Sequence, residues 1–165
     1  MPMLLYQTQN MSQQKAVAQA LAHLAVTSLI AEAELTPKPA LVDQRGSGAH
    51  TDLTLALMKR SAQTLSGTFE SMALASMNQP PDQALRECLG EIGREGERAM
   101  LEATDGVNTH RGAIWAVGLL VAGTAIAGFN VPAQHIAACA GALARLPDRF
   151  APDVPSHGLS MQKRY

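Results

Sequence analysis

The sequence predicts an all-α fold: a compact multi-helix bundle in a single domain over residues 1–165, with a buried apolar helix at its centre. Apolar residues make up 47% of the chain and aromatic residues only 4%, a composition that suits helices packed through small side chains. Apolar positions recur at helical spacing, and no segment shows the alternation of a strand. The length is sufficient for one domain with a substantial core.

Capping residues and helix breakers divide the chain into elements. Five positions are expected to cap helix starts: Ser12, Thr51, Asp82, Asn108 or Thr109, and Asn130. The helices are expected over residues 12–35, 51–77 with a break at Ser66-Gly67, 82–103, 110–129 and 130–146. Prolines at 37, 39, 80 and 81 separate them, Pro132 lies in a tolerated first turn, and the tail from Pro147 is expected to be a loop.

The central helix is predicted from a long uncharged stretch. Residues 112–144 contain no acidic or basic side chain except His135. A membrane hairpin over residues 113–144 is an alternative, but residues 113–129 fall short of the roughly 20 residues that a span requires. They are also rich in Ala and Gly rather than Leu and Ile, so a buried bundle helix is favoured.

Charge and cysteine content exclude several classes of protein. The formal net charge of −1 gives no field for nucleic acid or an anionic membrane. Cys88 and Cys139 are too few for a disulfide framework, so a reducing, cytoplasmic setting is expected. Residues 1–11 lack the basic-then-apolar order of a signal peptide.

The segment 104–112 is the most informative local pattern. Asp105-Gly106 predicts a tight turn, because Gly tolerates positive φ. A capped helix start follows, with His110 and Arg111 close to its free amides. The helix dipole and these donors favour an anion. An ordinary capped helix start is the alternative interpretation.

Helical spacing places several carboxylates relative to the core. Glu32 falls on the predicted apolar stripe of the first helix, together with Val17, Leu21, Leu24, Ala25, Ser28 and Leu35. A carboxylate there is costly unless it is paired, protonated or metal-bound, although Glu32 could also reach water from the helix end. On the 82–103 helix, Glu95 and Glu97 fall on the two flanks of the apolar face.

The loop 38–52 is rich in polar residues and long enough to suggest binding. Lys38 and Arg45 could contact phosphates, while Asp43 and Asp52 could hold a hard cation. Ser47, Gly48 and His50 directly precede a predicted helix N-terminus. Each has an alternative interpretation as an ordinary surface-loop residue.

Two longer patterns contain these residues. The first joins Glu32-Ala33-Glu34-Leu35-Thr36-Pro37-Lys38-Pro39, Leu41-Val42-Asp43 and Ser47-Gly48-Ala49-His50-Thr51-Asp52. The second joins Ile92-Gly93-Arg94-Glu95-Gly96-Glu97-Arg98-Ala99-Met100, Ala103-Thr104 and Gly106-Val107-Asn108-Thr109-His110-Arg111-Gly112-Ala113-Ile114. Together they resemble the two signatures of the triphosphoribosyl-dephospho-CoA synthases, in the same order and spacing. The resemblance runs from the first helix to Ser156-His157-Gly158.

The resemblance implies a reaction and partners. Such an enzyme transfers the 5-triphosphoribosyl group of ATP to a ribose 2′-hydroxyl of 3′-dephospho-CoA and releases adenine. The product is the precursor of the prosthetic group on an acyl-carrier subunit of malonate decarboxylase or citrate lyase. Malonate decarboxylase is preferred, because the citrate-lyase version is often fused to another transferase. The downstream partners implied are the prosthetic-group transferase and the acyl-carrier subunit.

The reaction also suggests roles for particular residues. The expected catalytic residues are Glu32, Asp52 and Glu97, with Glu32 as base or as the carboxylate that stabilises an oxocarbenium-like centre. The expected Mg²⁺ ligands are Asp52, Glu95 and Glu97. The expected substrate-binding residues are Lys38, Asp43, Ser47, His50, Glu95, Asn108, Thr109, His110 and Arg111.

The chain departs from the family pattern at three points. Ala40 stands where Gly is usual, and Arg111 where Lys is common. Family members also continue beyond Tyr165, so the chain is expected to be the N-terminal portion of a longer fold. The alternative interpretation is a non-catalytic, truncated helical module that forms a homodimer through its exposed core face.

Overall fold

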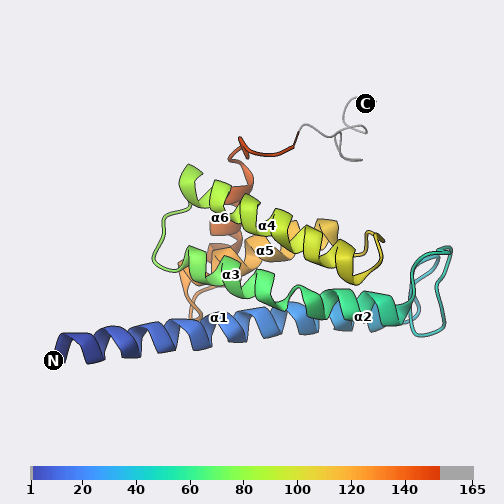
Figure 1. Cartoon of the computed structure of the whole chain (residues 1–165), viewed down its shortest axis with the longest axis horizontal. Helices are drawn as coiled ribbons and strands as arrows, with labels where there is room; N and C mark the ends of the chain where they lie inside the picture. Colours follow the sequence, from blue (N-terminus) through green and yellow to red (C-terminus); the bar gives the residue numbers. More distant parts are fainter. Residues whose placement is uncertain (1, 153–165) are drawn as a thin grey trace.

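The structure, a computed structural model, describes residues 2–152, with side chains from Asn10 onward. It confirms the all-α prediction (Figure 1). Six helices are present over these residues: α1 (Pro2–Glu34), α2 (Leu55–Thr64), α3 (Ser66–Ser76), α4 (Gln83–Ala103), α5 (Arg111–Ala127) and α6 (Ala133–Ala144). Residues 2–152 contain no strand, only an isolated bridge between Asp43 and Gly46. The sequence Ser156-His157-Gly158 lies outside the described residues.

Two of the predicted helix boundaries are confirmed, one of them set by a side-chain cap. Asp82 caps α4 as predicted, its carboxylate accepting from the Leu85 amide at 3.0 Å. The predicted break between α2 and α3 is also confirmed: Leu65 separates them, one residue before Ser66-Gly67. The Asp82 cap depends on short-range chemistry that is visible in the sequence, whereas Leu65 makes no side-chain capping bond at the start of α3.

Three predicted helix starts are wrong. Helix α1 begins at Pro2, upstream of Ser12. Thr54, not Thr51, caps α2, because its extended backbone directs the hydroxyl to the Leu57 amide at 3.1 Å. Helix α6 begins after Pro132 rather than at Asn130, since the residue before a proline is disfavoured in helical geometry.

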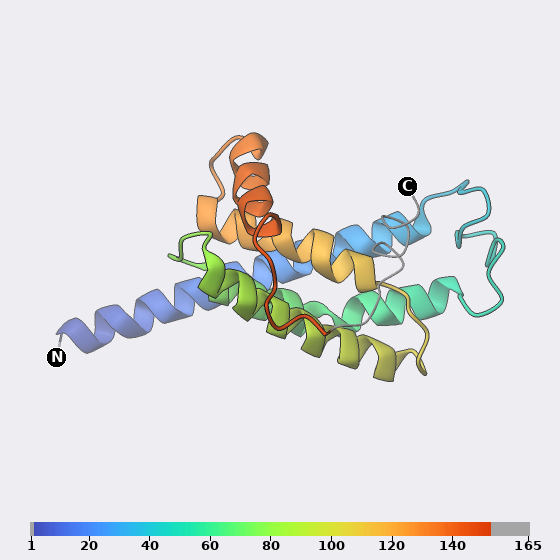
Figure 2. The same cartoon turned by 90° about the horizontal axis from the view of Figure 1, so that it is seen from above.

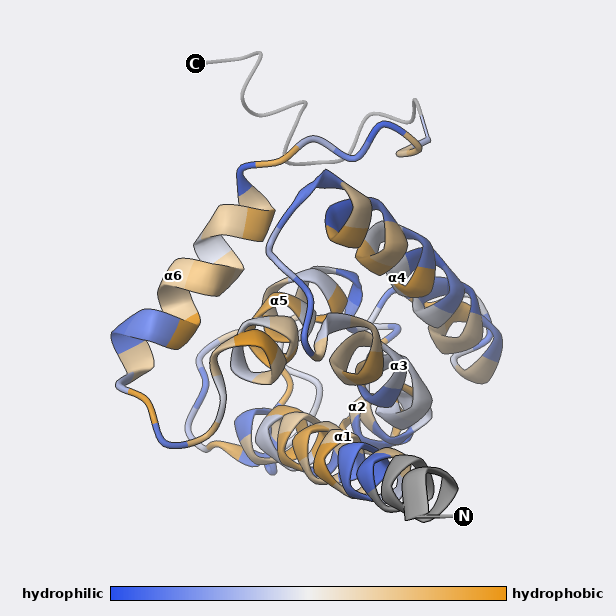
Figure 3. Ribbon diagram, turned by 90° about the vertical axis from the view of Figure 1, so that its left-hand side faces the viewer, coloured by the Kyte–Doolittle hydropathy of each residue, from blue (hydrophilic) through white to orange (hydrophobic). Residues whose placement is uncertain are grey.

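The centre of the bundle is shared by α3 and α5 (Figures 2 and 3). Helix α3 contacts α1, α2, α4 and α5, while α5 contacts α1, α3, α4 and α6. The predicted central position of α5 is therefore confirmed, although its Trp115 and Leu120 remain exposed. The largest fully buried apolar side chains are Phe69, Leu65, Leu89, Met100 and Leu143.

The buried face of α1 differs from the predicted stripe by one residue, about 100° around the helix. Leu21 and Ala25 are buried as expected, but Leu24 and Leu35 are exposed. The buried positions are mostly alanines: Ala18, Leu21, Ala22, Ala25, Val26, Leu29 and Ala33. These small side chains let α1 approach α2, α3 and α5 closely.

Among the described residues, one helix is long and apolar enough to span a membrane by length and composition, the Asn10–Glu34 part of α1. It is not part of the hairpin considered above, where α5 and α6 have only 17 and 12 residues. Because α1 packs against three other helices, and a core helix meets the same criterion, this is weak evidence for a membrane protein.

Candidate functional site

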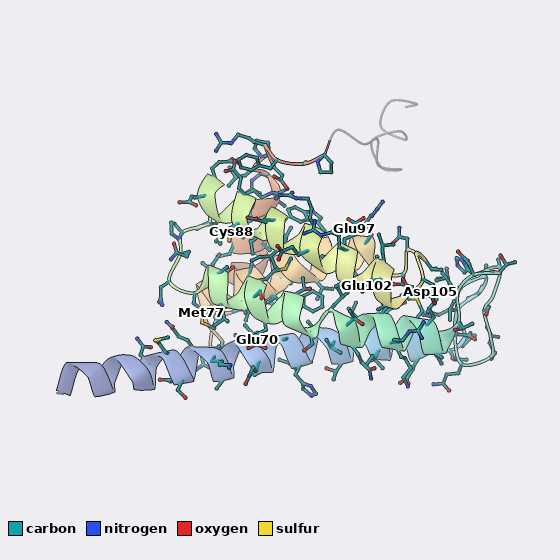
Figure 4. The ribbon with its side chains drawn as sticks, in the orientation of Figure 1. Glu70, Met77, Cys88, Glu97, Glu102 and Asp105 are labelled. Carbon is teal, nitrogen blue, oxygen red and sulfur yellow. The ribbon has the colours of Figure 1, made fainter. Side chains whose placement is uncertain are left out.

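The two sequence patterns meet at one end of the bundle. The loop that follows α1 and the turn between α4 and α5 lie near the α2 end of the molecule, where Asp105 is also found (Figure 4). Helix α2 connects them: Ser61 Oγ lies 2.5 Å from Thr109 Oγ1 and 2.8 Å from His110 Nδ1. Lys59 of the same helix pairs with Glu34 at 2.6 Å. Segments about 50 residues apart thus form one polar cluster.

The 104–110 turn adopts the predicted reversal. Asp105 and Gly106 both have positive φ, at 54° and 85°. Thr104 Oγ1 closes the turn: it lies 2.7 Å from the Met100 carbonyl and 2.6 Å from the Val107 carbonyl, either of which can accept its single proton. The Asn108 carboxamide accepts from the Arg111 amide at 3.2 Å, but the residue at the N-cap position of α5 is His110, which makes no side-chain capping bond. The prediction that Asn108 or Thr109 is the N-cap is therefore wrong, although the helix begins where it was expected.

His110 is buried, with 5% of its surface exposed. Its backbone amide donates to Met100 Sδ at 3.2 Å, and its Nε2 has no hydrogen-bond partner among residues 2–152. Burial lowers the pKa of this imidazole, and the nearby Glu32 carboxylate only partly opposes the effect. His110 is therefore neutral near pH 7, and a role as a cationic phosphate ligand does not fit its position.

The low pKa of His110 predicts a pH-dependent stability. The unfolded chain takes up a proton near pH 6.5, whereas folded His110 does so only at lower pH. The free energy of unfolding should therefore fall as the pH drops below about 6.5, with a slope of at most about one proton. His110→Gln should flatten this slope in urea unfolding between about pH 5 and 7. The exposed His23→Gln control should keep it; equal slopes in all three proteins would contradict the assignment.

Glu32 is exposed, which corrects the prediction that it lies among core side chains. Its carboxylate is 57% exposed and 3.0 Å from Lys38 Nζ, which also donates to the Glu32 carbonyl at 2.7 Å. The reason is the rotation of α1, which directs Ala33 rather than Glu32 into the core. A small cavity of about 220 Å³ adjoins this pair; its lining is Glu32, Lys38, Leu41, Val42, His50, Leu53 and Met58. Three predicted site residues therefore share one cavity.

Asp43 is a structural residue of the loop. It is 3% exposed, and its carboxylate accepts from the Lys38 amide, the Arg45 amide and Arg45 Nε at 2.8–2.9 Å. The Arg45 side chain, assisted by these amides, holds the pKa of Asp43 well below its usual range. Because these bonds occupy its carboxylate, Asp43 fits a loop-ordering role better than the predicted substrate or cation contact.

Ala40 adopts a left-handed backbone, with φ of 64°. This conformation costs an L-residue about 1–2 kcal/mol, which explains a preference for Gly at this position. Ala40→Gly should raise the free energy of unfolding by up to about 1 kcal/mol, after the larger entropy of the unfolded glycine is subtracted. Ala49→Gly, in the same loop but without positive φ, should instead destabilise the protein in urea unfolding. A loss of stability in both variants would contradict the inference that the backbone of Ala40 is strained.

The remaining loop residues lie close to the cavity. His50 Nδ1 lies 4.0 Å from Asp52 Oδ1, and the Ser47 carbonyl accepts from the His50 amide at 3.1 Å. The side chains of His50 and Asp52 are both exposed, 37% and 64%. They are therefore accessible to a ligand at this end of the bundle.

Glu97 and Arg111 are elsewhere. They pair with each other and line a separate cavity of about 350 Å³ beside α4 and α5. Glu95 pairs with Arg98 at 3.8 Å. Within the part of the chain that the structure describes, no group of three or more His, Cys, Asp or Glu side chains could hold a metal ion. Asp52, Glu95 and Glu97 thus do not form a preassembled magnesium site.

Sequence reasoning missed several residues of these sites. Ser61 and Lys59 on α2 contact the two patterns but belong to neither. Arg86 and Asp148 line the cavity beside Glu97. Ser61 had one available signal, since its polar side chain occurs on the buried face of an amphipathic helix. The position of Asp148 depends on the path that the chain takes after α6, which no local sequence pattern predicts.

Comparison with known proteins identifies the family. Residues 18–150 match the family model of ATP:dephospho-CoA triphosphoribosyl transferases. The chain belongs to this family. The resemblance drawn from the two sequence patterns is thereby confirmed, and the patterns coincide with the cluster at the α2 end and the cavity beside α4.

Curated family members are similar over most of the chain. It is 58% identical over 145 residues to the 2-(5″-triphosphoribosyl)-3′-dephosphocoenzyme-A synthase of Klebsiella pneumoniae, covering 88% of this chain and 52% of that protein. It is 55% identical over 150 residues to a probable synthase of Pseudomonas syringae pv. syringae, covering 90% and 52%. The chain therefore spans about half the length of the curated relatives it matches. No solved structure matches it significantly.

Proposed function

We propose that this protein transfers the 5-triphosphoribosyl group of ATP to 3′-dephospho-CoA and releases adenine. The observation that carries the proposal is the convergence of the two family patterns: Ser61 brings Thr109 and His110 to the α2 end, where Glu32, Lys38 and His50 line one cavity. An ammonium, a carboxylate and an imidazole thus line one cavity. The identity of the substrates is inferred from the family to which the chain belongs.

The chemistry divides among these groups. The bond from the ribose anomeric carbon to adenine breaks, and a bond from that carbon to the acceptor 2′-hydroxyl oxygen forms. The hydroxyl proton passes to a base, and one proton is returned to adenine, which leaves as the neutral molecule. An anionic Glu32 stabilises the positive charge at the anomeric carbon, and is the first candidate to accept the proton. Lys38, paired to it, is placed to contact phosphate oxygens.

Mg²⁺ is proposed as part of the ATP substrate rather than as a resident ion. The described carboxylates form no cluster that would hold the ion alone, whereas phosphate oxygens and water are its usual partners in nucleotide sites. Asp52 is the carboxylate near the cavity residue His50 that could contact such a complex. Glu95 and Glu97 would have to leave their arginine partners to do so.

The finer biological assignment is also a proposal. The product would supply the acyl-carrier subunit of malonate decarboxylase, in preference to citrate lyase, through a prosthetic-group transferase in the cytoplasm. Deleting the gene in the source organism and measuring the masses of its acyl-carrier subunits would test this choice. The carrier that then lacks the prosthetic group identifies the pathway.

Adenine release tests the activity. The protein is incubated with ATP, Mg²⁺ and dephospho-CoA, and free adenine is measured by chromatography while the product is identified by mass. Adenine in equal amount to product is expected, and the Klebsiella pneumoniae relative serves as positive control. No adenine from a folded protein, together with a dimer in sedimentation, would instead support the non-catalytic homodimeric module.

A further inference from the structure

A second charged cluster lies between α4 and the segment that follows α6. This segment, residues 146–152, runs along α4 (Figure 2). Arg86 and Arg94 of α4 both approach the Asp148 carboxylate, with Nη1 to Oδ2 distances of 3.5 and 2.6 Å. Asp148 is 7% exposed. One buried carboxylate is thus shared by two guanidinium groups, an arrangement with one excess positive charge.

Arg86 is incompletely satisfied. Its side chain is only 10% exposed, yet its Nη1 has no hydrogen-bond partner among the described residues. Nε donates to the Leu146 carbonyl at 3.1 Å, and the guanidinium lies over Trp115, 4.1 Å from the ring centroid. Burial lowers the pKa of Arg86, while Asp148 opposes the effect. A buried guanidinium with a free donor retains capacity for another anion.

The surroundings leave room for such an anion. Gly90 exposes the α4 backbone beside the cluster: a Cβ there would lie 2.2 Å from Asp148 Oδ2 and 3.1 Å from Arg86 Nη1. The adjoining cavity of about 350 Å³ extends from Arg86 and Arg94 to Arg111. This volume is within the range of small-molecule sites. The absence of a side chain at Gly90 therefore admits an anionic group against the helix.

We propose that Arg86 and Arg94 form a binding site for a phosphoryl group of a nucleotide substrate, and that the Asp148 carboxylate occupies this site until the substrate enters. A phosphoryl dianion balances two guanidinium groups more completely than one carboxylate does, and its oxygens can accept bonds from both forks. The inference rests on the proposed function for the identity of the ligand, but not for the existence of the anion site.

The single tryptophan provides a direct readout. Trp115 is the only tryptophan in the chain and contacts Arg86, so its emission should change when an anion binds there. Tripolyphosphate, ATP and dephospho-CoA are titrated separately at constant ionic strength, with chloride as reference. Saturable binding is expected, and Asp148→Asn should tighten it about tenfold by removing the competing charge.

Two arginine variants locate the site. Arg94→Gln should weaken tripolyphosphate binding about tenfold or more. Arg98→Gln, on the same helix but 70% exposed, should not. A rise in the thermal midpoint of the unmodified protein with tripolyphosphate provides a second measurement that needs no variant.

Three results would overturn the proposal: no saturable response in either wild type or Asp148→Asn, no rise in thermal midpoint, or equal weakening by the Arg94 and Arg98 variants. Binding of ATP but not dephospho-CoA would assign the site to the triphosphate donor, and the reverse to the acceptor. Anion binding is measured without turnover, so it can still be determined if the protein releases no adenine. The two proposals can therefore fail separately.

Discussion

Glu32→Gln is expected to slow adenine release about 10²–10⁴-fold, the usual contribution of a positioned acid–base or charge-stabilising carboxylate. Gln keeps the shape of the side chain and can still accept a hydrogen bond from Lys38 Nζ. It removes the negative charge that would face the anomeric carbon. The measurement is the initial rate of adenine formation at saturating ATP, compared with the apparent binding of dephospho-CoA.

Glu34→Gln is the matched control. Glu34 lies two residues away on the same helix end and pairs with Lys59 at 2.6 Å, but it does not line the cavity. Its replacement should alter the rate less than about tenfold, since an exposed ion pair contributes little. If the two variants lose activity equally, or if Glu32→Gln retains the wild-type rate, Glu32 has no catalytic role.

The sequence predicted the helices better than the faces they bury. The break near Ser66-Gly67 and the Asp82 cap depend on contacts within a few residues, so local chemistry determines them. The face of α1 depends on how closely several helices approach one another. The spacing of the large apolar residues predicted that Leu24 and Glu32 lie on the buried face of α1. Close packing of the helices instead buries mainly alanines there. The periodicity of apolar residues predicts an approximate apolar face, but the packing of neighbouring helices determines which residues near it are buried.

The site shows the same division. The Asp105-Gly106 reversal and the start of α5 directly after it could be predicted because they are local. The grouping of Glu32, Lys38 and His50 follows from the last turn of α1 and the loop directly after it. The separation of Glu97 and Arg111 into another cavity could not be predicted, because it depends on where α4 and α5 cross. Burial of His110 similarly depends on Ser61, almost 50 residues away.

Phe69→Ala should destabilise the protein by about 3–5 kcal/mol, through lost transfer free energy and the cavity that remains. Phe69 is fully buried on α3, the helix that contacts α1, α2, α4 and α5. Few neighbours can collapse into the space, because the surrounding helices are held to one another by the same core. Urea unfolding should show a lower midpoint with an unchanged slope.

Phe129→Ala provides the control for side-chain size. Phe129 follows α5 and is 51% exposed, so its replacement removes much less buried apolar surface and should cost under about 1 kcal/mol. Because α3 also carries the packing that brings α2 and its Ser61 to the turn before α5, Phe69→Ala should lower the temperature at which adenine release is lost. Equal stability of the two variants would show that α3 is not the centre of the core.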